Sequence, residues 1–289
     1  MARLGYCGLG VMGAPMAGHL AAAGHDVVVY NRTGSRALEG VAANGGRACP
    51  TPAEVAAESD IVFLCVGNDD DVREVMLGDN GILDGAHEGL IVVDHTTTSA
   101  ELAADMARSC EAHGTVFIDA PVSGGQAGAE NGVLTVMCGA DDGNAFDAVA
   151  AVVAAYSRSC VRLGRTGSGQ LAKMVNQICI AGLVQALSEG VAFAQNAGLD
   201  AHAVFDVISK GAAQSWQMEN RAHTMIDGKF DFGFAVEWMV KDLTYAIAEA
   251  HSNGSRVPVT EQVLGYYREL MDAGRNRYDT SSLVTRLPR

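Results

Sequence analysis

The chain has 289 residues, which is more than one hydrophobic core usually supports, so two domains are expected. Hydrophobic residues make up 48% of it, which indicates a globular protein rather than a disordered one. The net charge of −14 argues against a nucleic-acid partner and against an anionic membrane surface, because both are bound by basic faces.

The first half of the chain alternates strand-like and helix-like segments. A short apolar strand at 4–7 is followed by a helical segment at 11–23 and by a strand rich in β-branched residues at 27–30. Apolar runs of strand length recur at 61–66, 90–93 and 115–118, as expected for strands buried on both faces. Residues 1–163 are therefore predicted to form an α/β domain with a doubly wound, mostly parallel sheet.

The pattern changes after Leu163. Residues 169–197 form one long helical stretch, and further helix-like segments follow at 201–210, 235–252 and 259–273. Because this half shows no convincing strand, residues 164–289 are predicted to be an all-α domain joined to the first by the long helix. The last residues, 281–289, are expected to be a loose tail.

The seven cysteines are scattered singly, without the spacings of a zinc site, so we expect no bound metal. Most lie in apolar runs, which is typical of reduced thiols. The N-terminus lacks the pattern of a signal peptide, and no apolar run approaches the ~20 residues needed to span a bilayer. We therefore expect a cytoplasmic protein that does not bind a membrane.

A glycine-rich motif follows the first strand directly and opens the helix after it. There, Gly8 permits a tight turn, Gly10 lets the backbone approach a pyrophosphate, and Gly13 lets the helix pack on the sheet. The helix N-terminus favours the phosphates. We therefore expect a dinucleotide to bind here; the alternative is a glycine-rich turn without a ligand. The motif consists of Gly8, Leu9, Gly10, Val11, Met12 and Gly13.

The second strand ends where such domains contact the adenosine ribose. Asp or Glu there would bind the 2′-hydroxyl of NAD. This chain has Asn31, Arg32 and Thr33, and a guanidinium can pair with the 2′-phosphate of NADP by two hydrogen bonds. We expect NADP(H) to be preferred, with NAD(H) as a second choice; the alternative is an Arg32 that is only solvated.

Two more loops should line the cofactor, because ligands bind at the carboxyl ends of parallel strands. Val66, Gly67 and Asn68 follow one strand, and a run of three threonines that begins with Thr96 and Thr97 follows the next. Threonine hydroxyls there suit contacts with the cofactor, and they equally suit a helix N-cap before Glu101.

The long helical stretch holds one lysine in an apolar run. Asn176 and Gln177 follow Lys173 by three and four residues, so the three polar groups share one helix face. An ammonium beside two amides on an apolar helix suits a proton-transfer site. Taken alone, however, the stretch favours a solvent-exposed lysine with two surface amides, because such residues are common on surface helices.

Four ordered motifs resemble those of the β-hydroxyacid dehydrogenase family, which includes 3-hydroxyisobutyrate dehydrogenases, tartronate semialdehyde reductases and glyoxylate/succinic semialdehyde reductases. The resemblance covers nearly the whole chain. Many members have two asparagines after the lysine; the Asn176–Gln177 pair is similar to the tartronate semialdehyde reductase branch. The motifs are residues 8–16, 119–125, 167–177 and 241–243, the last after Phe230–Phe234.

The resemblance implies a Rossmann domain followed by a helical domain, a nicotinamide cofactor and a short substrate that carries a carboxylate. The residues that it implies are Lys173, Asn176 and Gln177 for catalysis, Ser123, Gly124 and Gly125 for substrate binding, Thr96 or Thr97 for the cofactor, and Lys241 near the cofactor with Asp242 beside it at the substrate.

We therefore expect an NAD(P)-dependent dehydrogenase or reductase that acts on CH–OH groups of a short β-hydroxy acid or semialdehyde carboxylate. Lys173 would be its general acid and base. The alternatives are an imine reductase-like NADPH enzyme, which usually lacks the lysine, a 6-phosphogluconate-type decarboxylating enzyme, which expects Lys-x-x-His-Asn, and a non-catalytic NADP-binding module. The Ala-rich helical domain suggests a homodimer or homotetramer.

Overall fold

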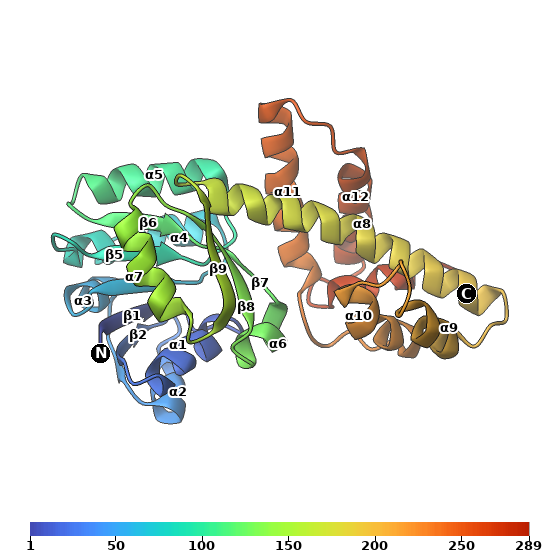
Figure 1. Ribbon diagram of the computed structural model, residues 1–289, viewed down its shortest axis with the longest axis horizontal. Helices are drawn as coiled ribbons and strands as arrows, with labels where there is room; N and C mark the ends of the chain where they lie inside the picture. The colour runs from blue at the N-terminus through green and yellow to red at the C-terminus, as the bar shows by residue number, and fades with distance from the viewer. Residues whose placement is uncertain (289) are drawn as a thin grey trace. The chain divides into compact units, whose positions relative to one another are not determined.

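The computed structural model describes residues 1–288, and Figure 1 shows their helices and strands. The chain divides into two compact units, Met1–Lys173 and Met174–Arg289. The division falls inside the long helix α8 (Ser168–Asn196), whereas the sequence suggested a boundary just before this helix.

The first unit is built on one sheet. Its strand order is β3-β2-β1-β4-β5-β6-β8-β7, and β9 pairs with β8. The pairs from β3 to β6 are all parallel, whereas β8 runs antiparallel to β6 and β7. The predicted doubly wound, mostly parallel sheet is thus confirmed. The strands are β1 (Arg3–Cys7), β2 (Asp26–Tyr30), β3 (Arg47–Ala48), β4 (Ile61–Leu64), β5 (Ile91–Asp94), β6 (Val116–Asp119), β7 (Val122–Ser123), β8 (Leu134–Gly139) and β9 (Ser157–Gly164).

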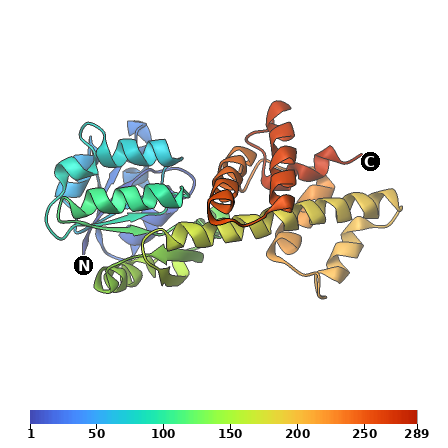
Figure 2. The ribbon, with the colours of Figure 1, turned by 90° about the horizontal axis from the view of Figure 1, so that it is seen from above.

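Helices cover both faces of this sheet (Figure 2). Successive strand residues enter two different hydrophobic cores: Val27 and Val29 belong to one, and Val28 belongs to the other. This burial on both faces explains why the strands are continuous apolar runs. The helices of this unit before α8 are α1 (Gly13–Ala22), α2 (Gly34–Asn44), α3 (Pro52–Ala57), α4 (Asp69–Leu77), η1 (Ile82–Gly85), α5 (Ala100–Glu111), α6 (Gly125–Glu130) and α7 (Gly143–Val153).

Four strands of the sheet were not expected from the sequence: the two-residue strands β3 and β7, and the longer strands β8 and β9. In β8, buried Leu134 and Val136 alternate with half-buried neighbours, and β9 carries exposed Arg158 and Arg162. Neither strand is therefore a continuous apolar run, which was the pattern that identified the other strands. Their position beyond β6, toward the edge of the sheet, accounts for this composition.

The second unit is helical, as predicted. Apart from one isolated bridge between Ala235 and Asp279, its described residues form no strand. Helix α10 was not expected, because only Met218, Ala222 and Met225 form its buried face and most of its other residues are polar. After α8, the helices of this unit are α9 (Ala201–Ile208), α10 (Trp216–Asp227), α11 (Val236–Asn253), α12 (Pro258–Asp272) and η2 (Thr280–Arg286).

The expectation of a loose C-terminal tail is wrong for the residues that the structure describes. Ser281, Ser282 and Leu283 are fully buried in η2, and Leu283 belongs to the helical core. Asp279 caps this segment by accepting the N–H and hydroxyl of Ser281, and it also pairs with Arg221 at 3.2 Å. The segment is rich in polar residues, so its burial could not be recognised from the sequence.

Helix α8 has the length and the composition of a membrane-spanning helix, contrary to the expectation that no apolar run approaches this length. Half of its most apolar 18-residue window is buried inside the protein. Such a helix also occurs in the core of proteins that do not enter membranes, so length and composition alone do not distinguish the two. The seven cysteines are free thiols, as their scattered positions in mostly apolar runs indicated.

Candidate functional site

The glycine motif lies in the loop between β1 and α1. Gly8 has φ 97°, and a Cβ atom there would lie 2.3 Å from the carbonyl oxygen of Cys65. A Cβ atom at Gly13 would lie 1.9 Å from the carbonyl oxygen of Gly8. At Gly10, by contrast, a Cβ atom would meet nothing within 4 Å. Two glycines are therefore required by backbone packing, and the third borders open space, which suits a ligand.

The end of β2 is tied to this loop. The side-chain oxygen of Asn31 accepts the N–H of Leu9 at 2.8 Å, and its amide donates to the carbonyl of Thr33 at 3.0 Å. Arg32 is 84% exposed and lies 3.0 Å from the carboxylate of Asp71. A hollow of about 400 Å³ opens here, lined by Tyr30, Asn31, Arg32, Gly34, Ala37, Leu38, Ala48, Cys49 and Pro50.

The loops after β4 and β5 meet at the same edge of the sheet. The N–H of Val66 donates to the hydroxyl of Thr96 at 3.0 Å, and Asn68 caps helix α4 by accepting the N–H of Asp71. Thr96 is buried, whereas Thr97 is only partly buried. Of the two threonines that the motif left open, Thr97 is thus the more accessible to a ligand.

His95 lies beside these loops but belongs to the core. Its Nδ1 donates to the carbonyl of Ala120 at 2.6 Å, and its Nε2 accepts the hydroxyl of Tyr156 at 2.7 Å. Burial lowers the pKa of His95 to about 4, so the ring is neutral at pH 7. It also stacks on Phe63, with ring centroids 5.6 Å apart. These contacts make His95 a structural residue rather than an acid or base.

Lys173 is almost fully buried, with 7% of its surface exposed. Its Nζ donates to the carbonyl oxygen of Val122 at 2.9 Å. Val122 precedes Ser123, Gly124 and Gly125, the expected substrate-binding loop. The structure therefore brings the lysine and this loop together within the first unit, and it contradicts the interpretation of Lys173 as a surface residue.

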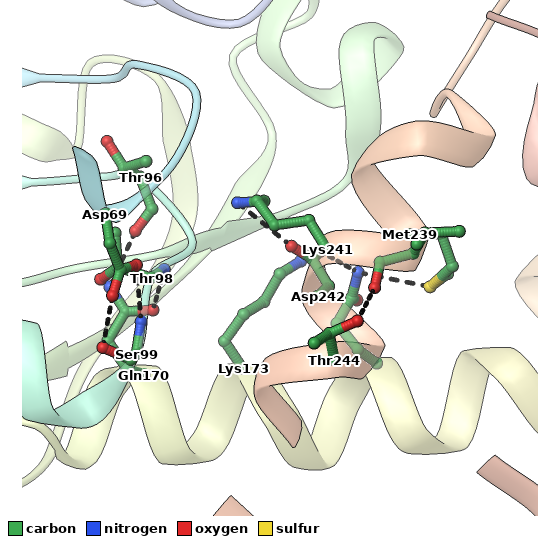
Figure 3. Close-up of polar contacts among 12 residues, drawn as sticks. Asp69, Thr96, Thr98, Ser99, Gln170, Lys173, Met239, Lys241, Asp242 and Thr244 are labelled. Carbon is green, nitrogen blue, oxygen red and sulfur yellow. Dashed lines mark hydrogen bonds and ion pairs between the residues drawn. The ribbon is translucent and has the colours of Figure 1, made fainter. Parts of the chain in front are cut away.

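The first turn of α8, which leads to Lys173, is held by two buried polar side chains. Gln170 donates to the carbonyl of Thr96 at 2.7 Å and accepts the N–H of Thr98 at 3.0 Å (Figure 3). Asp119, at the end of β6, accepts the N–H groups of Gly167 at 2.7 Å and of Gln170 at 2.9 Å. The ends of β5 and β6 thus fix the start of α8.

Neither of these two roles was assigned from the sequence. Asp119 was recognised only as the start of a motif, and Gln170 only as a helix residue. Burial raises the pKa of Asp119 to about 6, although the N–H groups around it act in the opposite direction. The available signal was an aspartate at the end of an apolar strand, followed along the chain by glycines at 167 and 169.

The polar residues of the second unit form a connected network. Asn176 donates to the side-chain oxygen of Gln177 at 2.7 Å, and Gln177 donates to Asp242 at 2.7 Å. The ammonium of Lys241 lies 3.3 Å from the other oxygen of Asp242 (Figure 3). It also lies 5.5 Å from the ring centroid of Tyr245. Four residues expected at the site are therefore neighbours, and Gln177 and Asp242 are both 2% exposed.

Within residues 1–288, no group of three or more His, Cys, Asp or Glu side chains is placed to hold a metal ion. Beside the buried carboxylates of Asp94 and Asp119, the strand ends carry backbone N–H groups, threonine hydroxyls and the Arg32 guanidinium. These are groups that bind phosphates and riboses.

Two family models cover most of the chain. Residues 3–164 match the NAD binding domain of 6-phosphogluconate dehydrogenase, and residues 167–287 match the NAD-binding domain of NADP-dependent 3-hydroxyisobutyrate dehydrogenase.

Similar proteins agree with these matches over almost their full lengths. An uncharacterised oxidoreductase of Shewanella frigidimarina is 58% identical over 99% of this chain and 98% of its own. The 2-hydroxy-3-oxopropionate reductase of Escherichia coli is 33% identical over 99% of this chain and 97% of its own. The solved structure of Mycobacterium tuberculosis 3-hydroxyisobutyrate dehydrogenase with L-serine has a TM-score of 0.89 and 28% identity, and the match covers 100% of both chains.

These matches extend over both units, and the glycine loop of the first unit has the geometry that dinucleotide binding requires. The chain belongs to the β-hydroxyacid dehydrogenase family, whose members are nicotinamide-dependent oxidoreductases that act on CH–OH groups.

Proposed function

We propose that this enzyme transfers hydride between NADP(H) and a short β-hydroxy acid or semialdehyde carboxylate, with Lys173 as its general acid and base. The observation that carries the proposal is the buried ammonium of Lys173, held 2.9 Å from the Val122 carbonyl beside the Ser123 loop. A buried lysine next to an anion-binding loop suits proton transfer to a carboxylate-bearing substrate better than it suits packing.

The bound nicotinamide would supply or accept the hydride, and the chain's own residues would manage charge and protons. During reduction, negative charge develops on the carbonyl oxygen of the substrate. The Lys173 ammonium stabilises this charge and then donates a proton from Nζ. During oxidation, the neutral amine accepts the hydroxyl proton. The bond to Val122 keeps Nζ beside the loop in both directions.

The substrate carboxylate is assigned to Ser123, Gly124 and Gly125. Both glycines have positive φ values, 136° and 62°, and a Cβ atom at Gly125 would meet nothing within 4 Å. Successive N–H groups in such a loop, together with the serine hydroxyl, can surround an anion. The net charge of −14 does not oppose this, because the local field of the site decides the binding of a small ion.

The network of the second unit is proposed to position the reacting groups. Asn176 and Gln177 follow Lys173 on the same helix. The two carboxylate oxygens of Asp242 lie 2.7 Å from the Gln177 amide and 3.3 Å from the Lys241 ammonium. Asp242 would therefore contribute to substrate binding by positioning the Gln177 amide and the Lys241 ammonium. Lys241 is assigned to the cofactor, as the family resemblance implies.

The dinucleotide is assigned to the glycine loop and to the hollow beside Arg32. The open space at Gly10 fits the pyrophosphate, and the exposed guanidinium fits a 2′-phosphate. The description of the second family model, which names an NADP-dependent enzyme, also supports NADP(H) over NAD(H). The rest of the cofactor would be lined by Val66, Gly67, Asn68 and Thr97. Thr96 would hold this loop in place by accepting the N–H of Val66.

Two relatives suggest which substrates to test first. The Escherichia coli relative is a 2-hydroxy-3-oxopropionate reductase, and the Asn176–Gln177 pair also favours this branch. The second candidate is 3-hydroxyisobutyrate, after the name of the solved relative. Lys173 argues against an imine reductase. Its presence with the amides and the Ser-Gly-Gly loop argues against a non-catalytic module.

A panel of small semialdehydes and hydroxy acids, assayed with NADPH, NADH and their oxidised forms, tests the proposal. We expect turnover with at least one of the two candidates and a higher kcat/KM with NADPH than with NADH. Lys173→Ala should lower kcat by about 10²–10⁴-fold with little change in NADPH affinity. Lys210→Ala removes an exposed lysine and serves as the control. A Lys173→Ala enzyme that keeps its activity would refute the assignment.

We further propose a cytoplasmic homodimer or homotetramer. Helix α8 exposes apolar side chains along its length, including Val175 at 61% and Phe193 at 73%. Such side chains are usually covered by a partner, and a second copy of this chain would cover them. Light scattering of the purified protein gives its mass directly. A mass of one chain at micromolar concentration would contradict the proposal.

A further inference from the structure

Arg32 already holds a carboxylate. Its Nη1 atom lies 3.0 Å from Oδ1 of Asp71, in the first turn of helix α4. The same arginine lines the hollow of about 400 Å³ beyond β2. The guanidinium that is assigned to the 2′-phosphate is thus paired within the chain.

The two side chains of this ion pair differ in how freely they can move. Asp71 is fixed by its helix, because Asn68 accepts its N–H at 2.9 Å and caps α4. Its side chain is 28% exposed. Arg32 is 84% exposed, on a long side chain in the loop after β2. When an anion enters, Arg32 can therefore move, whereas Asp71 stays where it is.

The other carboxylates of this helical turn are arranged differently. Asp69 accepts the N–H of Ser99 at 3.1 Å and its hydroxyl at 2.5 Å. Asp70 is exposed and forms no ion pair among residues 1–288. Asp71 is thus the carboxylate of this turn that acts on Arg32 directly.

Asp71 should have opposite effects on the binding of NADP(H) and of NAD(H). A 2′-phosphate is a dianion near neutral pH, so it must displace Asp71 from Arg32 or bind beside a like charge. Either outcome weakens NADP(H) binding. A 2′-hydroxyl is neutral and can donate to a carboxylate, as it does to the acidic residue of NAD-binding domains.

We propose that Asp71 limits the preference for NADP(H) over NAD(H) by competing with the 2′-phosphate for Arg32. The proposal rests on the assignment of Arg32 to that phosphate. Asp71 is therefore a specificity-determining residue that lies outside the segment after β2, where coenzyme preference is usually sought. Asp71 thus narrows the difference in affinity between the two coenzymes.

Asp71→Asn tests the inference, because it removes the charge and keeps the shape. We expect the ratio of kcat/KM for NADPH to that for NADH to rise about fivefold, the effect of one exposed charge pair. Direct titration with NADPH and with NADH should show that the ratio of the two affinities changes by the same factor. The effect should shrink in 0.5 M salt, because salt screens exposed charges. Asp70→Asn makes the same charge change in the same turn and should alter the ratio less than about twofold.

Arg32→Ala tests the assignment of Arg32 to the 2′-phosphate separately from the inference about Asp71. If NADPH Kd is the same in Arg32→Ala and wild type, the assignment of Arg32 to the phosphate is wrong. If Arg32→Ala weakens NADPH binding but Asp71→Asn leaves the ratio unchanged, the assignment stands and the inference about Asp71 is overturned. Equal effects of Asp71→Asn and Asp70→Asn would also overturn it, since they would reflect net charge alone.

Discussion

Gln170→Met should destabilise the first unit, because Gln170 joins helix α8 to the end of β5. Its amide nitrogen donates to the carbonyl of Thr96 at 2.7 Å, and its amide oxygen accepts the N–H of Thr98 at 3.0 Å. Gln170 and Thr98 are fully buried, and Thr96 is 2% exposed. Methionine is similar in length and volume but offers no N–H or oxygen, so it tests the two hydrogen bonds rather than packing.

The cost follows from the two backbone groups that lose their partners. A buried donor or acceptor left without a hydrogen bond costs about 1–3 kcal/mol. Two such groups cost roughly 2–6 kcal/mol, and the gain from burying methionine lowers the expected loss in the free energy of unfolding to about 2–5 kcal/mol. The loop at Thr96 and Thr97 should also loosen, so NADPH binding should weaken together with stability.

Urea unfolding followed by circular dichroism measures the loss. Gln126→Met is the matched control, because it makes the same substitution in the same unit at an amide that donates to Glu130 at the surface. The control should change the free energy of unfolding by less than about 0.5 kcal/mol. Equal stability of the two variants would refute the argument that Gln170 fixes the start of α8.

Three further predictions test other parts of the structure. Gly13→Ala should destabilise the protein by about 1–3 kcal/mol, because its Cβ atom would lie 1.9 Å from the Gly8 carbonyl oxygen; Gly10→Ala, in open space, should keep stability and weaken NADPH binding. Equal unfolding midpoints for these two variants would contradict this. The pKa of Asp119 is raised to about 6, so the native state retains a proton that the unfolded chain loses near pH 4. Its ionisation therefore lowers the stability of wild type relative to Asp119→Asn as the pH rises from about 4 to about 6, by roughly 2–3 kcal/mol; unfolding at several pH values would show a constant difference if this is wrong. Leu283→Ala, in η2, should cost about 2–5 kcal/mol, whereas a loose tail would tolerate it without a change in unfolding midpoint.

The sequence was sufficient where a single pattern determines the structure. Continuous apolar runs located β1, β2, β4, β5 and β6, since burial on both faces leaves no polar positions. The glycine motif located the turn after β1, because backbone contacts at Gly8 and Gly13 exclude any side chain. Such features are local, and each needs only a few adjacent residues.

The features that were missed depend on contacts between distant segments. Asp119 binds N–H groups about fifty residues later in the chain, and Asp279 binds the N–H of Phe234. A buried polar residue of this kind has no periodic pattern, and in the sequence it resembles a surface residue. The burial of η2 was also missed, because residues at the end of the chain were expected to be loose.

Helix α8 shows why the lysine was difficult to interpret from the sequence alone. Polar Gln170, Lys173 and Gln177 are buried at 0%, 7% and 2% exposure, whereas apolar Val175 and Phe193 are exposed at 61% and 73%. At these positions the usual polarity of a helix in water is reversed, whereas other apolar residues of α8, such as Val184 and Val191, are buried in the helical core. The buried polar side chains are costly unless each has a partner, and an exposed apolar row is costly unless something covers it. Each face of α8 therefore calls for a different explanation. Hydrogen bonds to the end of β5 explain the burial of Gln170. As proposed above, we assign Lys173 to proton transfer and the exposed apolar side chains to contact with a second copy of the chain.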